Sequence, residues 1–153
     1  MWVPPEEKDP TVLLAPTRKS ISLFGAVNIN DGRLVTRFEK VFDAMTFKKF
    51  IIQLLRTKKP GKKIVLILDN AKYHHAKILK PLLRKHRAAL RLEFLPPYSP
   101  DLNPVERVWK LTRKICTHNV HFEKLDKLKA TVQNQHRKWR KPNRTLARLC
   151  CIT

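Results

Sequence analysis

The feature that most constrains the fold is the run from Ile64 to Leu68, which places five apolar residues in a row directly before Asp69. The run is too short for an ordinary helix and is rich in β-branched residues, so it predicts a strand that is covered on both faces. Open α/β sheets bind their ligands beyond the carboxyl ends of the strands. We therefore expect Asp69 to lie at the edge of a sheet where chemistry is usually placed.

The segments after this strand predict a helix and a second strand. Residues 76–86 carry apolar side chains at helical spacing between lysines and arginines, which predicts an amphipathic helix with a basic outer face. Residues 90–95 return to a strand pattern. Two strands joined by a helical crossover are expected to be parallel neighbours.

Two strands and a helix are predicted upstream of the apolar run. Residues 20–28 and 33–41 have strand patterns on either side of the turn sequence Asn30-Asp31-Gly32, so they should form an antiparallel hairpin. Residues 45–55 place apolar side chains at helical spacing, and Lys59-Pro60-Gly61 ends that pattern.

A proline-rich loop and a helix with a clear start follow residue 95. Residues 96–104 hold four prolines, which predicts a stiff extended loop. Asn103 is a favoured N-cap, Pro104 suits the first helical position, and Glu106 can complete a capping box. Cations that can pair with Glu106 follow at helical spacing, namely Lys110 and Arg113.

The end of the chain predicts a further helix and a basic tail. The helix after Asn103 is expected to bury one apolar face, made of Val105, Val108, Trp109, Thr112, Ile115 and Cys116. Residues 122–139 repeat the helical pattern, and Pro142 separates them from a short tail. The basic stretch at 137–141 is interpreted as a solvated helix end, with DNA contact as a second use.

The charge of the chain points to a polyanionic partner. Lys and Arg outnumber Asp and Glu 33 to 12, giving a formal net charge of +21. Such a charge favours nucleic acid, because binding to phosphates releases counterions; a basic RNA-binding protein and a membrane-surface protein are the alternatives. No apolar run reaches the ~20 residues that cross a bilayer. Three cysteines, two of them adjacent, match neither a disulfide framework nor a paired zinc site, so we expect a cytoplasmic, nucleoid-associated protein.

Asp69 and Glu106 are candidate metal ligands. They are separated by 36 residues that hold one predicted helix and one predicted strand. Carboxylates on rigid elements suit Mg²⁺, and a pair of such ions supports phosphodiester cleavage. On these residues alone, a turn residue at 69 and a helix-capping residue at 106 explain the pattern as well.

Two motifs in this region resemble a known family. The sequence Leu68-Asp69-Asn70-Ala71 with His74, and the block LPPYSPDLNPVERVW at residues 95–109, resemble the second and third catalytic blocks of DDE transposases of the mariner-like insertion-sequence group. Looser matches at Trp2 with its proline pair and at Phe24-Gly25-Ala26 extend the resemblance over residues 1 to about 125. The block at 95–109 is too specific to be expected by chance.

The resemblance implies a fold, a cofactor and a reaction. It implies an α/β, ribonuclease-H-like mixed sheet flanked by helices, with Mg²⁺ or Mn²⁺ as cofactor and double-stranded DNA, both transposon ends and target, as partner. Asp69 matches the second metal-binding acid and Glu106 the third. Metal-dependent hydrolysis would free the 3′-hydroxyl at the end of the element, and that hydroxyl would then attack target DNA.

Other positions of the motifs have roles that the resemblance implies. Asn70 and His74 match residues beside the site, where they could orient the Asp69 carboxylate or contact phosphate; for His74 and His75, polar residues at a helix start are an equal alternative. Asp101 and Asn103 belong to the long block, and Asp101 is expected to brace the loop through backbone amides. Tyr98 is expected to pack the loop, with DNA contact as the alternative. Cations expected to bind DNA are Lys72, Lys110, Arg113 and Lys114.

The family's first catalytic Asp has no match here. Asp9 lies in a proline-flanked arm and Asp31 in a hairpin turn, so neither has the strand context that the family needs. A helix-turn-helix region that recognises terminal repeats is also missing. We therefore expect a transposase fragment that lacks the first central strand and is complemented by an upstream transposase fragment, with a homodimer also open. The alternative is a catalytically inactive, basic DNA-binding remnant.

The sequence predicts three parts. Residues 1–19 contain four prolines and form an extended arm, residues 20–120 form the catalytic domain, and residues 121–153 form a basic helical region.

Overall fold

The computed structural model describes residues 11–14 and 19–151, which form two compact units. One unit combines residues 1–40 with 104–153, and the other spans residues 41–103. Each unit is described by itself. The mixed α/β class predicted from the sequence is confirmed, whereas the division into arm, catalytic domain and basic region stays a prediction. No helix in the described part of the chain is long and apolar enough to cross a membrane.

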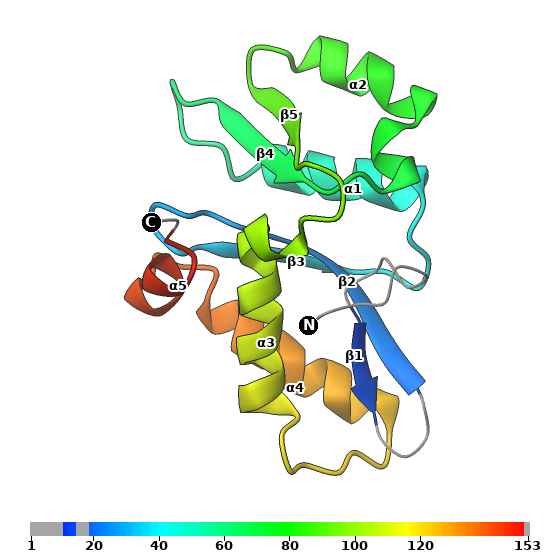
Figure 1. Cartoon of the computed structure of the whole chain (residues 1–153), viewed down its shortest axis with the longest axis vertical. Helices are drawn as coiled ribbons and strands as arrows, with labels where there is room; N and C mark the ends of the chain where they lie inside the picture. The colour runs from blue at the N-terminus through cyan, green and yellow to red at the C-terminus, as the bar shows by residue number, and fades with distance from the viewer. Residues whose placement is uncertain (1–10, 15–18, 152–153) are drawn as a thin grey trace. The chain divides into compact units, whose positions relative to one another are not determined.

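The first unit contains a three-stranded antiparallel sheet in the order β1-β2-β3 (Figure 1). The first half of β2, Lys19–Val27, pairs with β1, Thr11–Leu14, and its second half pairs with β3, Leu34–Phe38. The predicted hairpin is confirmed, and Gly32 in its turn has a φ of 75°, which favours glycine.

Strand β1 adds a strand, not predicted from the sequence, within the expected extended arm over residues 1–19. Residues 11–14 hydrogen-bond to β2 in the register Thr11↔Ser22 to Leu14↔Lys19. Val12, Leu13 and Leu14 supply the apolar, partly β-branched composition that strands favour, and the neighbouring prolines hid this pattern. The rest of the predicted arm lies outside the described residues.

Among the described residues of this unit, three helices pack with its sheet. Helices α3, Pro104–Cys116, and α4, Leu125–Lys138, contact β2 and each other, and α5, Arg144–Leu149, contacts α3. The buried core that they share with the sheet includes Leu23, Leu34, Val108, Trp109, Leu128, Val132, Trp139 and Leu146.

Three expectations for these helices are corrected. Helix α4 begins at residue 125 rather than 122, and the tail predicted after Pro142 forms α5, because the Asn143 side chain caps it by accepting a hydrogen bond from the Leu146 amide at 2.9 Å. Ile115, predicted to be buried, is 49% exposed. It lies at the edge of an apolar stripe that the core covers only as far as Thr112 and Cys116.

The second unit pairs two parallel strands with helix α1. Helix α1, Ala44–Leu55, begins with a capping box between Asp43 and Thr46. Strand β4, Ile64–Leu68, and strand β5, Leu90–Phe94, are parallel neighbours in the register Ile64↔Leu90 to Leu68↔Phe94, which confirms the prediction.

The prediction that β4 is covered on both faces is wrong for this structure. Leu66 and Leu68 are buried, whereas Val65 is 55% exposed and Ile67 is 42% exposed. Among the described strands, β4 pairs with β5 alone, and the partners of the exposed residues are Arg91 and Glu93. One face of this strand pair therefore carries both apolar and charged side chains at its surface.

The crossover between these strands is less regular than predicted. Instead of one helix over residues 76–86 it contains two short 3₁₀ turns, η1, Lys72–His75, and η2, Lys77–Leu79, followed by α2, Lys80–Lys85. Pro81 lies in the first turn of α2 and has no amide hydrogen, so it favours a helix that starts there. The proline-rich loop likewise contains a 3₁₀ turn, η3, Pro100–Leu102.

Candidate functional site

Asp69 follows β4 directly, at the carboxyl end of the strand as predicted. Its Oδ1 accepts a hydrogen bond from the backbone amide of Ala71 at 3.1 Å and lies 3.1 Å from Nδ1 of His74. The side chain is 52% exposed. The carboxylate is therefore oriented by two contacts while it stays accessible to solvent.

His74 makes one of the two contacts to the Asp69 carboxylate. Its Nδ1 lies 3.0 Å from the backbone oxygen of Asp69 as well as near Oδ1, and because both neighbours are acceptors we assign the hydrogen to Nδ1. The ring is 7% exposed, with ring-centroid distances of 4.4 Å to Phe47 and 4.5 Å to Tyr73. His75 differs, since it is exposed and stacks on Phe94 at 4.2 Å.

Asn70 joins the carboxyl ends of the two strands. Its Nδ2 donates a hydrogen bond of 2.6 Å to the backbone oxygen of Leu95, and the Leu95 amide donates one of 2.7 Å to the oxygen of Leu68. The start of the proline-rich loop is therefore tied to the residue next to Asp69.

The proline-rich loop presents its aromatic residue to solvent. Tyr98 is 95% exposed and has a φ of 55°, so the prediction that it packs the loop is wrong. Pro96, Pro97 and Pro100 restrict the backbone on both sides of this tyrosine. Asp101 is exposed, and its bracing role stays a prediction.

Glu106 lies in the first turn of α3 and is half-buried. Burial lowers the pKa of the Arg113 guanidinium, and the charge of Glu106 opposes this shift, while a direct pairing of the two side chains stays a prediction. Arg113 Nε also donates to the backbone oxygen of Trp109 at 3.3 Å. Asn103 directly precedes this helix, and its capping role stays a prediction.

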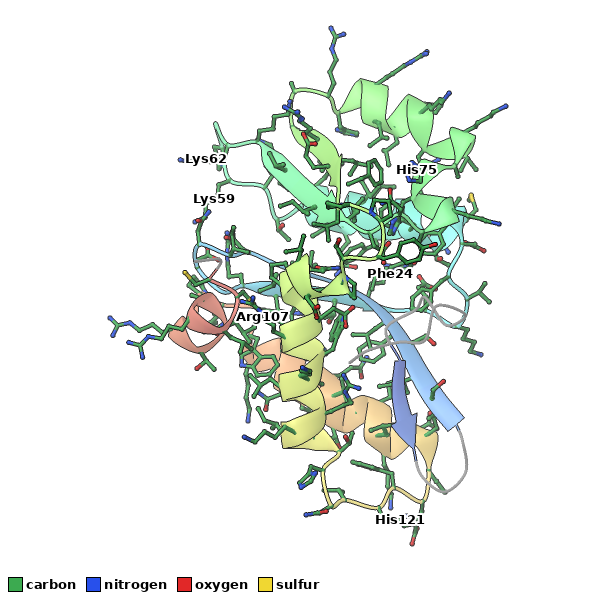
Figure 2. The ribbon with its side chains drawn as sticks, viewed as in Figure 1. Phe24, Lys59, Lys62, His75, Arg107 and His121 are labelled. Atoms are coloured by element: carbon green, nitrogen blue, oxygen red, sulfur yellow. The ribbon has the colours of Figure 1, made fainter. Side chains whose placement is uncertain are left out.

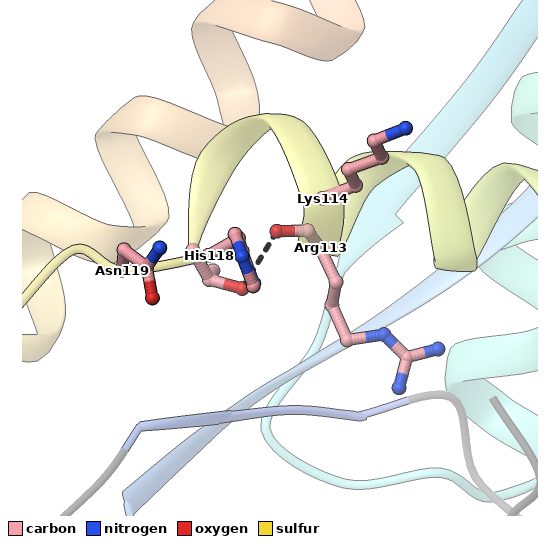
Figure 3. A pocket seen from close by; sticks show the side chains of 5 residues that line it. Arg113, Lys114, His118 and Asn119 are labelled. Atoms are coloured by element: carbon pink, nitrogen blue, oxygen red, sulfur yellow. Dashed lines mark hydrogen bonds between the residues drawn. The ribbon is translucent and has the colours of Figure 1, made fainter.

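The four cations predicted to bind DNA differ in exposure. Lys72, Lys110 and Lys114 are exposed, whereas Arg113 is half-buried. Arg113 and Lys114 line an open pocket of about 590 Å³ at the end of α3, together with Thr117, His118 and Asn119 (Figure 3). In the turn that follows α3, the His118 amide donates to the Arg113 oxygen at 3.0 Å. Its last three residues were not predicted, since nothing in their local pattern marks them.

Arg107 has a role that the sequence did not indicate. Its Nη1 donates to the backbone oxygens of Leu149 at 3.1 Å and Cys151 at 3.2 Å, which lie at the end of α5 (Figure 2). The Sγ of Cys150 also lies 3.6 Å from the Pro104 oxygen. The turn that carries Glu106 is thus attached to a helix more than 40 residues away in the chain.

The acids of the described residues do not form a complete metal site. Among residues 11–14 and 19–151, no group of three or more His, Cys, Asp or Glu side chains could hold an ion. Asp31 is engaged in the hairpin, where its Oδ2 lies 2.9 Å from Arg33 Nε. Asp69 and Glu106 lie in different units and are described separately, so their predicted convergence stays a prediction.

Comparison of the sequence with known proteins gives two matches. Residues 1–129 match the family described as "DDE superfamily endonuclease". A protein of Sinorhizobium fredii (strain NBRC 101917 / NGR234), described as "Uncharacterized protein y4pE/y4sA", is 35% identical over 104 residues, which are 68% of this chain and 73% of that protein.

Comparison of the structures finds similar folds in DNA-processing proteins. The catalytic domain of Mos1 mariner transposase matches with a TM-score of 0.68 at 17% identity, over 92% of this chain and 71% of that chain. A chain of the Mos1 strand transfer complex matches with a TM-score of 0.63 at 18% identity, over 98% and 44%. A chain of a simian T-cell lymphotropic virus intasome in complex with a PP2A regulatory subunit, B56 gamma, matches with a TM-score of 0.58 at 15% identity, over 81% and 45%. The fold therefore resembles ribonuclease-H-like transposase catalytic domains.

Proposed function

Because the chain belongs to the DDE superfamily of endonucleases, we propose that it is the catalytic part of an insertion-sequence transposase. Its reaction would be metal-dependent hydrolysis of a phosphodiester at the end of the element, followed by strand transfer into target DNA. The neighbours include a strand transfer complex and an intasome, which supports double-stranded DNA as the partner. Cleavage and transfer of DNA strands would place the protein in the cytoplasm, at the nucleoid.

The observation that carries this proposal is the setting of Asp69. The carboxylate stands at the end of β4, oriented by the Ala71 amide and by His74, and is 52% exposed. A carboxylate that is both fixed and accessible suits a catalytic metal, because the ion needs ligands that do not have to be reorganised when substrate binds.

The available donors fit a hard divalent cation. The superfamily typically uses divalent metal ions, and Asp69 and Glu106 supply the carboxylate oxygens that Mg²⁺ and Mn²⁺ prefer. When bound, the metal would activate water and stabilise charge on the phosphodiester. In this proposal His74 holds the Asp69 carboxylate in place, Asn70 holds the loop beside it, and the exposed cations Lys72, Lys110 and Lys114 contact DNA phosphates.

We further propose that this chain supplies two of three catalytic acids. In the sequence, neither Asp9 nor Asp31 has the strand context that the family's first acid needs. An upstream transposase fragment would supply the remaining acid on a strand beside β4, which pairs with one strand among those described. A homodimer is a further arrangement for the complete enzyme.

Iron-directed cleavage of the protein tests whether the two acids share an ion. Fe²⁺ bound in place of Mg²⁺ and treated with ascorbate and peroxide cuts the backbone nearby. We expect cuts next to both Asp69 and Glu106, and loss of both cuts in either Asp69→Asn or Glu106→Gln. Asp101→Asn and Glu123→Gln, which change other exposed acids, should keep both cuts. Cuts at one acid that survive removal of the other would contradict a shared ion.

A nicking assay separates the proposal from the second candidate function, an inactive DNA-binding remnant. The second candidate rests on the missing match for the family's first catalytic Asp, since neither Asp9 nor Asp31 has the expected strand context in the sequence. We expect the purified chain to bind DNA without cutting it in Mn²⁺, and the upstream fragment to restore cutting that requires Asp69. Cutting by the chain alone that Asp69→Asn abolishes would show a complete site. No cutting with the upstream fragment would favour the remnant.

A further inference from the structure

Tyr98 combines two properties that are unfavourable for a residue without a partner. Its side chain is 95% exposed, and its φ of 55° lies in the left-handed region that favours glycine. An exposed aromatic ring does not gain the hydrophobic stabilisation that burial would give. The left-handed backbone conformation is strained for a residue with a Cβ atom. Such strain persists where the surrounding structure imposes it, and it gathers at functional sites.

The loop around Tyr98 is held at both ends. At its start, Leu95 is bonded to Asn70 Nδ2 at 2.6 Å and to the Leu68 oxygen at 2.7 Å. Beyond the tyrosine, Ser99 Oγ donates to the Pro97 oxygen at 3.2 Å and the Asn103 amide donates to the Pro100 oxygen at 3.0 Å. The ring is therefore presented from a restrained base, which lowers the entropy that a binding event must offset.

The position of the loop relates the ring to Asp69. The loop leaves β5 where β5 lies beside the carboxyl end of β4, and Asn70 connects the two. A phosphodiester placed at Asp69 would bring its flanking nucleotides close to this loop. Their bases offer flat faces on which an aromatic side chain stacks.

We propose that Tyr98 stacks on an unpaired base next to the phosphodiester at Asp69, and this inference rests on the proposed function. A base inside a duplex is covered by its neighbours on both faces, and a paired base at a blunt end is held by its partner, so an overhanging or flipped-out base is the one that is free to stack on the ring. Tyr98 would then select DNA ends with an open base over continuous duplex. Its phenol oxygen is not needed for stacking.

A fluorescence assay with the full chain tests this. The probe is a short duplex with a single-stranded 3′ overhang that carries 2-aminopurine, compared with the same duplex without the overhang. Stacking quenches 2-aminopurine. We expect the natural chain and Tyr98→Phe to quench it. Tyr98→Ala should lose the quenching and bind the overhang roughly tenfold more weakly, while its affinity for the blunt duplex changes little. Leu102→Ala, which removes an exposed apolar side chain of the same loop, should behave like the natural chain.

The outcomes are distinct. Equal quenching by Tyr98→Ala and the natural chain would overturn the assignment of Tyr98 while leaving the proposed function intact. Binding of the overhang DNA by the natural chain without any quenching would have the same meaning. Failure of the natural chain to bind either DNA at low salt would overturn both. Tyr98→Gly separates stacking from folding, because it removes the ring and also relieves the left-handed strain. It should fold at least as stably as the natural chain and still fail to quench.

Discussion

At the scale of single residues, contacts between positions distant in the sequence explain features that their local patterns leave open. Gly25 lies in β2 directly beneath Trp109 of α3, so close that a Cβ atom there would overlap the indole, with Cζ2 at 2.6 Å. Likewise, the buried position of His74 is explained by its ring contacts with Phe47 and Tyr73 and by the hydrogen bond that Asp69 accepts from its ring. Both residues belong to motif segments, and the structure supplies a physical reason for each.

Gly25→Ala should destabilise the protein by overpacking. Trp109 is 4% exposed and has no free space to move into, so the added methyl group should cost roughly 1–3 kcal/mol. Urea unfolding measures this, and the penalty should shrink in a Trp109→Phe background, where the ring is smaller. Gly61→Ala is the control, since nothing lies within 4 Å of its added Cβ and its cost should be the same in both backgrounds. An equal penalty for Gly25→Ala in both backgrounds would refute the steric explanation.

His74→Ala should weaken metal binding without removing a metal ligand. It takes away the ring that lies 3.1 Å from Oδ1 of Asp69, and loss of such a supporting contact typically lowers metal affinity about 10- to 100-fold. Titration with Mn²⁺ under electron paramagnetic resonance measures the affinity. His75→Ala is the matched control because that ring stacks on Phe94 instead. Unchanged affinity in His74→Ala, with folding intact, would argue against the orienting role.

At the scale of elements, the helices are joined by polar contacts that cross long stretches of sequence. Arg107 of α3 donates to the last carbonyls of α5, and Asn143 before α5 donates to the Gly32 oxygen at 2.7 Å. Between α3 and α4, Thr112 Oγ1 lies 3.0 Å from His136 Nε2. A hydrogen bond of this kind satisfies groups that burial would otherwise leave unpaired.

Arg107→Gln should loosen α5. The guanidinium satisfies two carbonyl oxygens at the end of this short helix, and hydrogen bonds to charged groups contribute about 1.5–3 kcal/mol. Amide hydrogen exchange should accelerate most at the amides of Ala147 and Cys150, which donate to the backbone oxygens of Asn143 and Leu146. Arg148→Gln removes an exposed charge from the same helix and should leave exchange unchanged. Equal effects of the two substitutions would mean that charge alone matters.

His136 should make the α3–α4 pair sensitive to acid. Burial lowers its pKa from 6.5 to about 4, so the unfolded chain binds a proton more readily than the folded one. Stability is therefore full above about pH 6.5 and is lost as the pH falls toward 4, by up to about 3 kcal/mol. Urea unfolding across this range measures the slope.

The control for His136 uses another histidine. The double variant His136→Leu with Thr112→Val removes the buried polar pair together, and its stability should vary less over the same pH range. His121→Gln changes an exposed histidine and should keep the natural slope. If the double variant loses stability with acid as steeply as the natural chain, other groups cause the effect.

At the scale of the whole molecule, the positive net charge is the feature expected to govern the affinity for DNA. A net charge of +21 is available to a polyanion, and the exposed cations lie on both units. Affinity for DNA should therefore fall steeply with salt, since each phosphate contact releases counterions. This long-range attraction needs no particular sequence, so it would bring the protein to DNA before any site is selected.

Substitutions of cations should separate direct phosphate contacts from structural charges. Lys110→Gln and Lys114→Gln should each reduce the slope of log affinity against log salt by about 1 if the side chain contacts a phosphate. Arg113→Gln should change stability more than the slope, because Arg113 is half-buried and donates to the Trp109 oxygen. Fluorescence anisotropy at several salt concentrations measures the slope. A larger slope change for Arg113 than for the lysines would place it at the DNA instead.

Local pattern was sufficient for most of the elements and for naming the candidate acids. The strand before Asp69, its parallel partner, the hairpin and the helix carrying Glu106 all follow from hydrophobic spacing and turn residues, because these act between neighbours in the chain. The motif at residues 95–109 indicated the family for the same reason, since it is a contiguous string. The bounds of α2 and α4 were less accurate, and β1 and α5 were missed beside prolines.

The exposure of individual side chains and the contacts between distant segments could be read only from the folded chain. The surface position of Val65 and Ile67, the outward ring of Tyr98, the attachment of Arg107 to α5 and the fit of Gly25 under Trp109 each involve segments that meet only after folding. The residues next to a position in sequence do not identify such partners, because packing depends on the shapes of side chains and on hydrogen bonds between segments that are distant in the chain. The acids were visible in the string of residues, and the surroundings that orient one of them became visible in three dimensions.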